Sequence, residues 1–145
     1  MLLFKVILFA FWMPSVIAVN QSETEQVKLI VEVENMVNLN GKPIRIAIDK
    51  KEGFLKDAKP FEYAIIPCSV AKLSHTFDLP KGEYAVSVYH DLNGNEKLDK
   101  NFFGAPSEPY GFSRNFKPFM SAPKFDDVKI LLNQDRKITI TLIHP

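Results

Sequence analysis

The segment that decides the fold is "KGEYAVSVYHDLNGNEKLD", residues 81–99. In its first half, apolar side chains occur at every second position, at Tyr84, Val86 and Val88, which is typical of a strand with one buried face. In its second half, Asp and Asn residues occupy alternate positions from Asp91 onward. The segment therefore predicts a β-strand that runs directly into a loop rich in oxygen ligands.

Segments on both sides of this strand have the same period of two. The alternation is clear at residues 27–33 and 44–48, weaker at 62–66 and 73–79, and clear again at 128–132 and 138–142. The turn "NQDR" between the last two predicts that they pair as a hairpin. No segment has a sustained helical period, and ten prolines also argue against helices. We therefore expect an all-β fold, an antiparallel β-sandwich of about seven strands that is immunoglobulin-like or transthyretin-like, with one long ordered loop.

The first 18 residues have the composition of a secretory signal peptide. A single basic residue, Lys5, precedes an apolar stretch, and the small residue Ala18 stands at the expected cleavage position. We expect cleavage after Ala18, a flexible N-terminal segment at residues 19–26 and one domain at residues 27–145; an uncleaved anchor is the alternative. This predicts a periplasmic or secreted protein with no membrane span once the leader is removed.

Charge and cysteine content exclude some functions. Loss of Lys5 with the leader reduces the basic residues from 18 to 17, equal to the 17 acidic residues. Because a neutral domain has no surplus of Lys and Arg for phosphates, we expect no nucleic-acid partner. The only cysteine, Cys68, cannot form an internal disulfide. We expect it to be a small buried residue, with a free reactive thiol as the alternative.

The oxygen-rich loop has the spacing of a calcium site. Counted from its first aspartate, it has side-chain oxygens at positions 1, 3, 5 and 9, the ligand positions of EF-hand loops, and a backbone carbonyl is expected at position 7. Glu96 replaces the usual glycine at position 6, and Phe102 replaces the usual glutamate at position 12. The sequence predicts a calcium site of roughly millimolar affinity, formed by Asp91, Asn93, Asn95, Lys97, Asp99 and, as the substitute acid, Glu108. A metal-free turn capped by the same Asp and Asn side chains is the alternative.

A long irregular segment, residues 91–124, contains six aromatic residues. Loops of this length are uncommon in compact domains unless they are functional or disordered. We expect the rings to fold inward and attach the segment to the sandwich. In the alternative, Tyr110 and Phe112 are exposed and contact an envelope glycan or a small apolar ligand.

The sequence contains no combination of residues typical of an enzyme. His90 stands beside Asp91, but a histidine at the end of a strand and next to a turn is typical of a structural residue. There is no nucleophile with an evident base, no zinc-spaced histidine pair and no phosphate-binding glycine loop. We therefore expect no catalytic residue; an enzyme would need a pocket where His90 meets another histidine or an arginine such as Arg114.

The run "GEYAVSVYHDLNGNEKLDKNFFGAPSEPYGFSRN", residues 82–115, resembles the signature of a bacterial exported family known as domain of unknown function 2141. That signature is approximately G-x-Y-A, then H-D-x-N-x-N-x-x-L-D, then N-x-x-G-x-P-x-E-x-Y-G-F-S-x-N. The resemblance implies a secreted or periplasmic single-domain β-sandwich without an established activity, and the family often has glycine where this chain has Glu96. The matching positions are His90, Asp91, Asn93, Asn95, Leu98, Asp99, Asn101, Gly104, Pro106, Glu108, Tyr110, Gly111, Phe112, Ser113 and Asn115.

These features together predict an exported, noncatalytic β-sandwich in which calcium orders the long segment. The alternative is a module that binds an envelope glycan or a small apolar ligand without metal. A protein partner in the envelope is also compatible with the sequence.

Overall fold

The structure is a computed structural model that describes residues 25–37, 39, 41–56 and 58–145. The expected signal peptide, residues 1–18, and residues 19–24 of the expected flexible segment lie outside the described residues. The elements in chain order are β1 (Gln26–Glu34), β2 (Pro43–Asp49), β3 (Glu62–Pro67), β4 (Lys72–Pro80), β5 (Gly82–His90), β6 (Tyr110–Phe112), the 3-10 helix η1 (Ser113–Asn115), α1 (Phe125–Val128), β7 (Ile130–Leu132) and β8 (Arg136–Thr141). Within the described ranges, no helix is long and apolar enough to cross a membrane.

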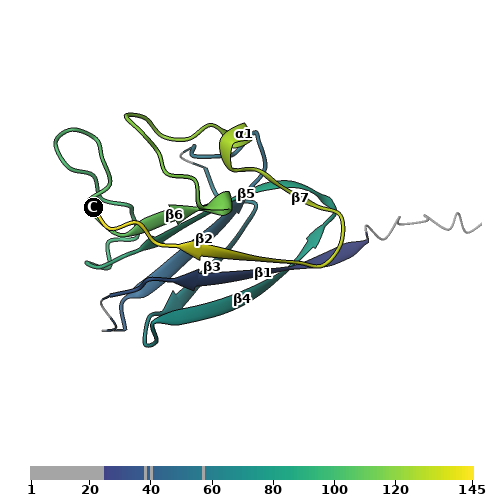
Figure 1. Cartoon of the computed structure of the whole chain (residues 1–145), viewed down its shortest axis with the longest axis horizontal. Coiled ribbons are helices and arrows are strands. Elements are labelled where there is room, and N and C mark those ends of the chain that lie inside the picture. The colour runs from purple at the N-terminus through teal and green to yellow at the C-terminus, as the bar shows by residue number, and fades with distance from the viewer. Residues whose placement is uncertain (1–24, 38, 40, 57) are drawn as a thin grey trace, which may run out of the picture.

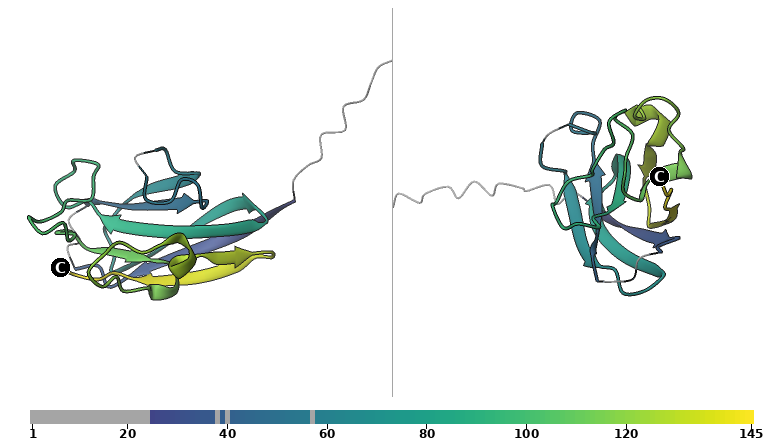
Figure 2. Two further views of the ribbon diagram at one scale, coloured as in Figure 1. Left: turned by 90° about the horizontal axis from the view of Figure 1, so that it is seen from above. Right: turned by 90° about the vertical axis from the view of Figure 1, so that its left-hand side faces the viewer.

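The strands form two sheets that pack as a β-sandwich, as the sequence predicts (Figures 1 and 2). One sheet has the order β4-β1-β8 and the other the order β3-β2-β5-β6, with β7 also paired to β5. The pairs are antiparallel except for β1 and β8, which run parallel. The sandwich is therefore mixed and not purely antiparallel.

The predicted hairpin between the last two strands is wrong. β7 pairs with β5, whereas β8 crosses to the other sheet and pairs with β1. The alternation in the two segments identifies each as a strand, but a period of two does not determine which strand is the neighbour. By crossing over, β8 places Ile140 in the core and adds a third strand to the smaller sheet.

The main core lies between the sheets and comes from the alternating apolar positions that the sequence shows. Leu29, Val31 and Val33 of β1 are fully buried, as is Tyr84 of β5. Cys68 is also fully buried, with its Sγ atom 3.4 Å from the sulfur of Met36. Burial raises the pKa of the Cys68 thiol, so the expectation of a small buried residue is confirmed over that of a reactive thiol.

A second, smaller core covers the outer side of β5 and attaches the long segment. It contains Phe54, Ala85, Phe112, Phe125 and Val128. The rings meet edge to face, with Phe54 6.4 Å from Phe112 and 6.0 Å from Phe125 between centroids. Burial of each ring contributes about 1.5–3 kcal/mol, so this core holds the segment firmly to the sheet.

The segment between β5 and α1 is not irregular throughout, because it contains β6. β6 pairs with β5 and bridges to the C-terminal end, where Tyr110 and Ile143 exchange backbone hydrogen bonds. Gly111 permits this close approach, since a Cβ atom there would lie only 2.6 Å from Ile140 Cγ2. A strand of three residues is too short to show alternation, which explains why the sequence did not reveal it. The chain before β6 projects from the same end of the sandwich as the C-terminus (Figures 1 and 2).

Candidate functional site

The chain leaves β5 at Asp91, whose carboxylate organises the start of the loop. Asp91 is fully buried, and its Oδ1 accepts hydrogen bonds from the N–H groups of Gly94 (2.7 Å) and Asn95 (3.1 Å). Its Oδ2 accepts one from Arg45 Nε (2.9 Å) and one from the N–H of Glu96 (3.0 Å). Burial acts to raise the pKa of Asp91, but the hydrogen bonds from Arg45 and the backbone outweigh it and hold the pKa below its usual value.

Glu108 closes the loop from the other side. It is buried, its Oε1 accepts the N–H of Leu92 at 2.8 Å, and its Oε2 accepts the N–H of Asp99 at 3.1 Å. One carboxylate thus joins the first and last residues of the turn to the chain entering β6. We call Asp91, Glu108 and Arg45 the loop anchor.

The remaining predicted metal ligands meet at Asp99. The side-chain amides of Asn93 and Asn95 donate to its two carboxylate oxygens, at 2.6 and 2.9 Å. Their carbonyl oxygens accept the backbone N–H groups of Asn95 and Lys97. The spacing predicts that the oxygens of these side chains and of Asp91 converge on one centre. In the structure the amide nitrogens of Asn93 and Asn95 face Asp99, while Asp91 accepts backbone N–H groups, so the contacts are hydrogen bonds.

The residues fit a calcium ion only in part. All four carboxylate oxygens of Asp91 and Glu108 accept N–H groups that hold the loop together. Of the three predicted acidic ligands, this leaves only Asp99, which is bonded to the two side-chain amides, to provide a carboxylate for a metal. In the part of the chain that the structure describes, no group of three or more His, Cys, Asp or Glu side chains is placed to hold a metal. A calcium ion held by Asp99 and the two amides would face a single formal negative charge, and calcium sites with so little charge bind weakly.

Glu96 takes the left-handed conformation that the glycine usual at this position would supply. Its φ is 67°, a region that costs a non-glycine residue about 1–2 kcal/mol. Its carboxylate lies 3.4 Å from Arg45 Nη2. The departure from the usual glycine is thus accommodated by the backbone, and the longer side chain reaches the loop anchor.

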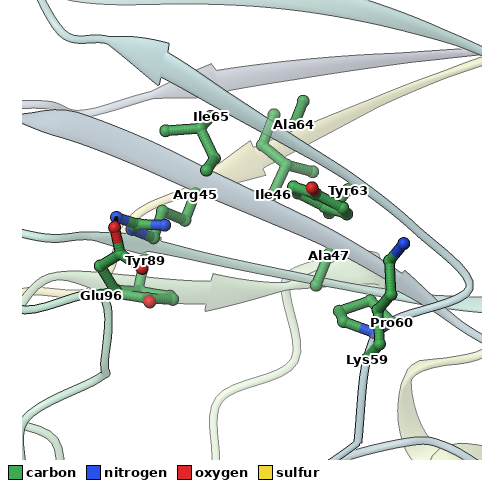
Figure 3. A pocket seen from close by; sticks show the side chains of 10 residues that line it. All are labelled: Arg45, Ile46, Ala47, Lys59, Pro60, Tyr63, Ala64, Ile65, Tyr89 and Glu96. Carbon is green, nitrogen blue, oxygen red and sulfur yellow. Dashed lines mark ion pairs between the residues drawn. The ribbon is translucent and has the colours of Figure 1, made fainter.

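Through Arg45 the loop anchor borders a cavity of about 400 Å³ on the outer face of the larger sheet, which we call the sheet-face cavity. Figure 3 shows Arg45 and Glu96 together at one end, Lys59 and Pro60 at the other, and Ala47 between them. Its walls are Arg45, Ile46, Ala47, Lys59, Pro60, Tyr63, Ala64, Ile65, Tyr89 and Glu96. Sequence reasoning missed this site because its residues lie on three strands and two connecting segments, with no local motif.

A second cavity, of about 390 Å³, lies between two parts of the long segment. We call residues 97–107 the first arm, residues 114–124 the second arm, and this space the inter-arm cavity. Tyr110 and Phe112 form part of its wall, but Phe112 is buried and Tyr110 is partly buried, so the alternative in which both are exposed is wrong. The lining is mainly apolar: Leu55, Leu98, Lys100, Phe103, Gly104, Ala105, Pro106, Tyr110, Phe112, Pro118, Met120, Ser121, Ala122 and Pro123.

The aromatic residues of the long segment divide into two groups. The expectation that they fold inward is confirmed for those nearest β6, since Phe112 is buried and Tyr110 and Phe116 pack partly against the second core. It is wrong for the three other rings: the side chains of Phe102, Phe103 and Phe119 are 97%, 90% and 84% exposed. Met120, next to Phe119, is 93% exposed.

A local turn explains why the rings of the first arm point outward. Asn101 Oδ1 accepts the N–H groups of Phe103 and Ala105, and its carbonyl oxygen accepts the N–H of Gly104. A turn that satisfies its own backbone needs no contact with the sheet. The sequence signal was present in Asn101 and Gly104, which flank the two phenylalanines.

His90, the only histidine considered for catalysis, is fully buried at the end of β5 and lines neither cavity. Burial lowers its pKa, which favours the neutral ring. Arg114, the arginine considered as its partner, is exposed on the second arm and donates to the carbonyl of Asp126. The two residues do not form a common pocket.

Comparison with known proteins gives one match. The sequence profile of a family described as "Uncharacterized protein conserved in bacteria (DUF2141)" matches residues 31–141, which include the loop anchor and both cavities. No curated protein and no solved structure matches the chain.

Proposed function

Since the chain belongs to the bacterial family of uncharacterised proteins DUF2141, its role has to be argued from its own site, and we propose that it is an exported, noncatalytic binding module. In this proposal the loop anchor holds the long segment in place, and the inter-arm cavity receives a small apolar ligand. Export is supported by the composition of the first 18 residues. Sequencing the N-terminus of the protein recovered from outside the cytoplasm tests that part, with Val19 expected as the first residue.

The observation that carries the proposal is the lining of the inter-arm cavity. Its volume of about 390 Å³ lies in the range of roughly 300–1,000 Å³ typical of small-molecule sites. Lys100 and Ser121 are the only polar side chains besides the Tyr110 hydroxyl that line it. A glycan needs many hydrogen-bond partners, so this lining favours an apolar group over a sugar.

The cavity can be blocked without touching the core. Ala122 is exposed and lines the inter-arm cavity, so Ala122→Trp would fill it, and Ala58, which is exposed and lines neither cavity, provides the matched control Ala58→Trp. We would titrate N-phenyl-1-naphthylamine, an uncharged aromatic probe, and follow its fluorescence. We expect saturable binding to the wild type and to Ala58→Trp, and at least about tenfold weaker binding to Ala122→Trp, because even one methylene group that does not fit an apolar pocket changes binding by roughly 10–200-fold.

Two results would contradict the proposal. One is an absence of saturable probe binding to the wild type. The other is equal affinity in Ala122→Trp and Ala58→Trp, which would place the probe elsewhere on the surface.

A second candidate function is calcium binding by the loop, which the convergence of Asn93 and Asn95 on Asp99 supports. In this candidate the Asp99 carboxylate, the two amide oxygens and the Lys97 carbonyl hold the ion, while Asp91 and Glu108 keep their bonds to backbone N–H groups. Affinity is expected to be about millimolar, as in extracellular modules.

Calorimetric titration with calcium chloride, combined with thermal melting, tests this candidate. At about 10 mM calcium, well above the expected dissociation constant, the wild type should release or absorb heat and melt at a higher temperature. Asp99→Asn, which keeps the shape and removes the charge, should show neither effect, and magnesium should be much weaker than calcium. If the wild type shows no heat of binding and no change in melting temperature, the loop does not bind calcium and is held by its hydrogen bonds alone.

A further inference from the structure

The tips of the two arms carry the largest apolar exposure in the described part of the protein. Phe102, Phe103, Phe119 and Met120 are each more than four-fifths exposed, whereas the other exposed large apolar side chains lie between 42% and 60%. Soluble monomers seldom expose clustered apolar groups of this size unless the cluster is an interaction site. The arrangement therefore indicates a surface that is covered when the protein acts.

The exposed groups belong to one surface. Phe103 from the first arm and Met120 from the second both line the inter-arm cavity, so the two tips stand on either side of its mouth. Phe102 packs edge to face on Phe103, with 5.5 Å between ring centroids. Since the Asn101 side chain fixes the first tip by accepting the N–H groups of Phe103 and Ala105, these rings are held outward.

The two arms also differ from the rest of the chain in charge, because basic residues are concentrated on them. The first arm contains two basic residues and one acid, and the second arm contains three basic residues and no acid, so the arms together carry a formal charge of +4. The whole chain carries +1, which leaves −3 on the remainder. The single acid, Asp99, has its carboxylate engaged by two amides. The arms that carry the exposed rings thus have a surplus of basic residues, all of them exposed: Lys97, Lys100, Arg114, Lys117 and Lys124.

We infer that the arm tips dock on the surface of an anionic phospholipid bilayer. Exposed Phe and Met side chains enter the boundary between headgroups and acyl chains, and lysines beside them extend to the phosphate groups, which is how interfacial anchors bind. Apolar insertion and attraction to anionic lipid act together, each basic residue near the surface adding to affinity.

A second copy of the chain fits this surface less well. An isologous dimer through the tips would bring the same basic arms against each other, and like charges in an interface are unfavourable. A bilayer supplies the opposite charge along its whole surface. The inference goes beyond the proposed function, since docking of the tips does not require a ligand in the inter-arm cavity.

Co-sedimentation of the mature chain with vesicles tests the inference. We would compare vesicles of equal parts phosphatidylglycerol and phosphatidylcholine with vesicles of phosphatidylcholine alone. Binding should be at least about tenfold stronger to the anionic vesicles and should weaken as salt is raised, because surface charges are screened over a Debye length.

Variants separate the tips from the cavity and from the rest of the surface. Phe102 and Phe119 line neither cavity, so Phe102→Ser combined with Phe119→Ser should lower vesicle binding about tenfold or more while probe binding in the cavity persists. Lys100→Glu combined with Lys117→Glu should remove the preference for anionic vesicles. The matched control is Leu131→Ser combined with Val70→Ser, at half-exposed apolar positions elsewhere, and it should bind as the wild type does.

The failures of the two proposals can be told apart. Vesicle binding that persists in Ala122→Trp while probe binding is lost supports docking independently of the cavity. Equal binding of the tip variant and its control, an absence of binding to anionic vesicles, or a dimer in sedimentation velocity that the tip substitutions dissociate would each overturn docking on a bilayer. In every variant an unchanged melting temperature confirms that the fold is intact.

Discussion

The base of the long segment, by which we mean β6 (Tyr110–Phe112), and the two arms both contain aromatic residues, but the rings of the base pack against the second core whereas those at the arm tips are exposed. At the base, β6 places Phe112 in the second core and Tyr110 against it. In the arms, Phe102 and Phe119 are almost fully exposed. All four residues are aromatic, so hydrophobicity alone does not decide which of them is buried.

The difference lies in what satisfies the backbone. β6 pairs with β5 and with Ile143, so its side chains are held against the sheet whether or not they are apolar. The first arm satisfies its backbone through the side chain of Asn101, which leaves its rings without a surface to pack on. The base therefore stabilises the fold, whereas the arms form a surface that is available for contact with a partner.

Truncation of one ring in each region is the most direct way to break this comparison. Phe112→Ala should lower the free energy of unfolding by about 3–5 kcal/mol, because it empties a buried site in the second core. Phe102→Ala, at a ring that is 97% exposed, should change it by less than about 0.5 kcal/mol. Urea unfolding of the two variants measures both values, and similar losses would mean that the arms are structural as well.

The loop anchor offers the next largest effect. Asp91→Ala leaves Arg45 without its buried partner and the N–H groups of Gly94 and Glu96 without an acceptor, so we expect a loss of about 3 kcal/mol. Asp99→Ala, at a carboxylate that is only partly buried, should cost less than about 1 kcal/mol. If thermal unfolding shows that the two substitutions lower the free energy of unfolding equally, the burial of Asp91 does not add to the stability of the protein.

The pH dependence of the same pair sharpens the test. Because the pKa of Asp91 is lower in the folded protein than its ordinary value of 3.8, its contribution is fully present above pH 3.8 and is lost as the pH falls through the folded pKa. The difference in stability between wild type and Asp91→Ala should therefore be constant from neutral pH down to about pH 5 and shrink below about pH 3.8. A difference that already shrinks between pH 7 and pH 5 would assign the effect to another group.

The sequence allowed prediction of every strand with clear alternation, because burial of one face leaves a local pattern. It did not allow prediction of strand partners, and the parallel pair of β1 and β8 replaced the expected hairpin for that reason. β6 was missed because three residues carry no period, although Gly111 and the buried Phe112 define its position.

The candidate site was predictable where its residues are close in sequence. The spacing predicts that the side chains of Asn93, Asn95 and Asp99 lie close together, since alternate side chains of a turn face the same centre, but it does not predict that the amide nitrogens face Asp99. The part played by Arg45 was not predictable, because it comes from β2, 46 residues before Asp91. Whether each aromatic ring is buried or exposed was not predictable either, because it depends on strand pairing in the folded chain.

Close packing of β6 on β8 gives a smaller effect at the base. Gly111→Ala would bring Cβ to 2.6 Å from Ile140 Cγ2, so the strand or the side chain must shift, at a cost of about 1–3 kcal/mol. Gly53→Ala is the matched control, since a Cβ there meets its nearest atom at an ordinary 3.6 Å. Equal melting temperatures of the two variants would show that β6 can move away from β8, and hydrogen exchange at Tyr110 would then be fast.

The smallest effect is expected at Glu96, where the anchored and the exposed parts of the segment meet. Its φ of 67° is unfavourable for any residue except glycine, and its ion pair with Arg45 is mostly exposed. Glu96→Gly relieves the strain but adds chain entropy to the unfolded state, so its stability should remain within about 1 kcal/mol of the wild type. Glu96→Ala loses the ion pair and keeps the strain, so it should be about 1 kcal/mol less stable than Glu96→Gly. Chemical unfolding of both variants decides the matter: if Glu96→Ala is the more stable of the two, the left-handed turn does not form, and the loop anchor alone separates the fixed base from the exposed arms.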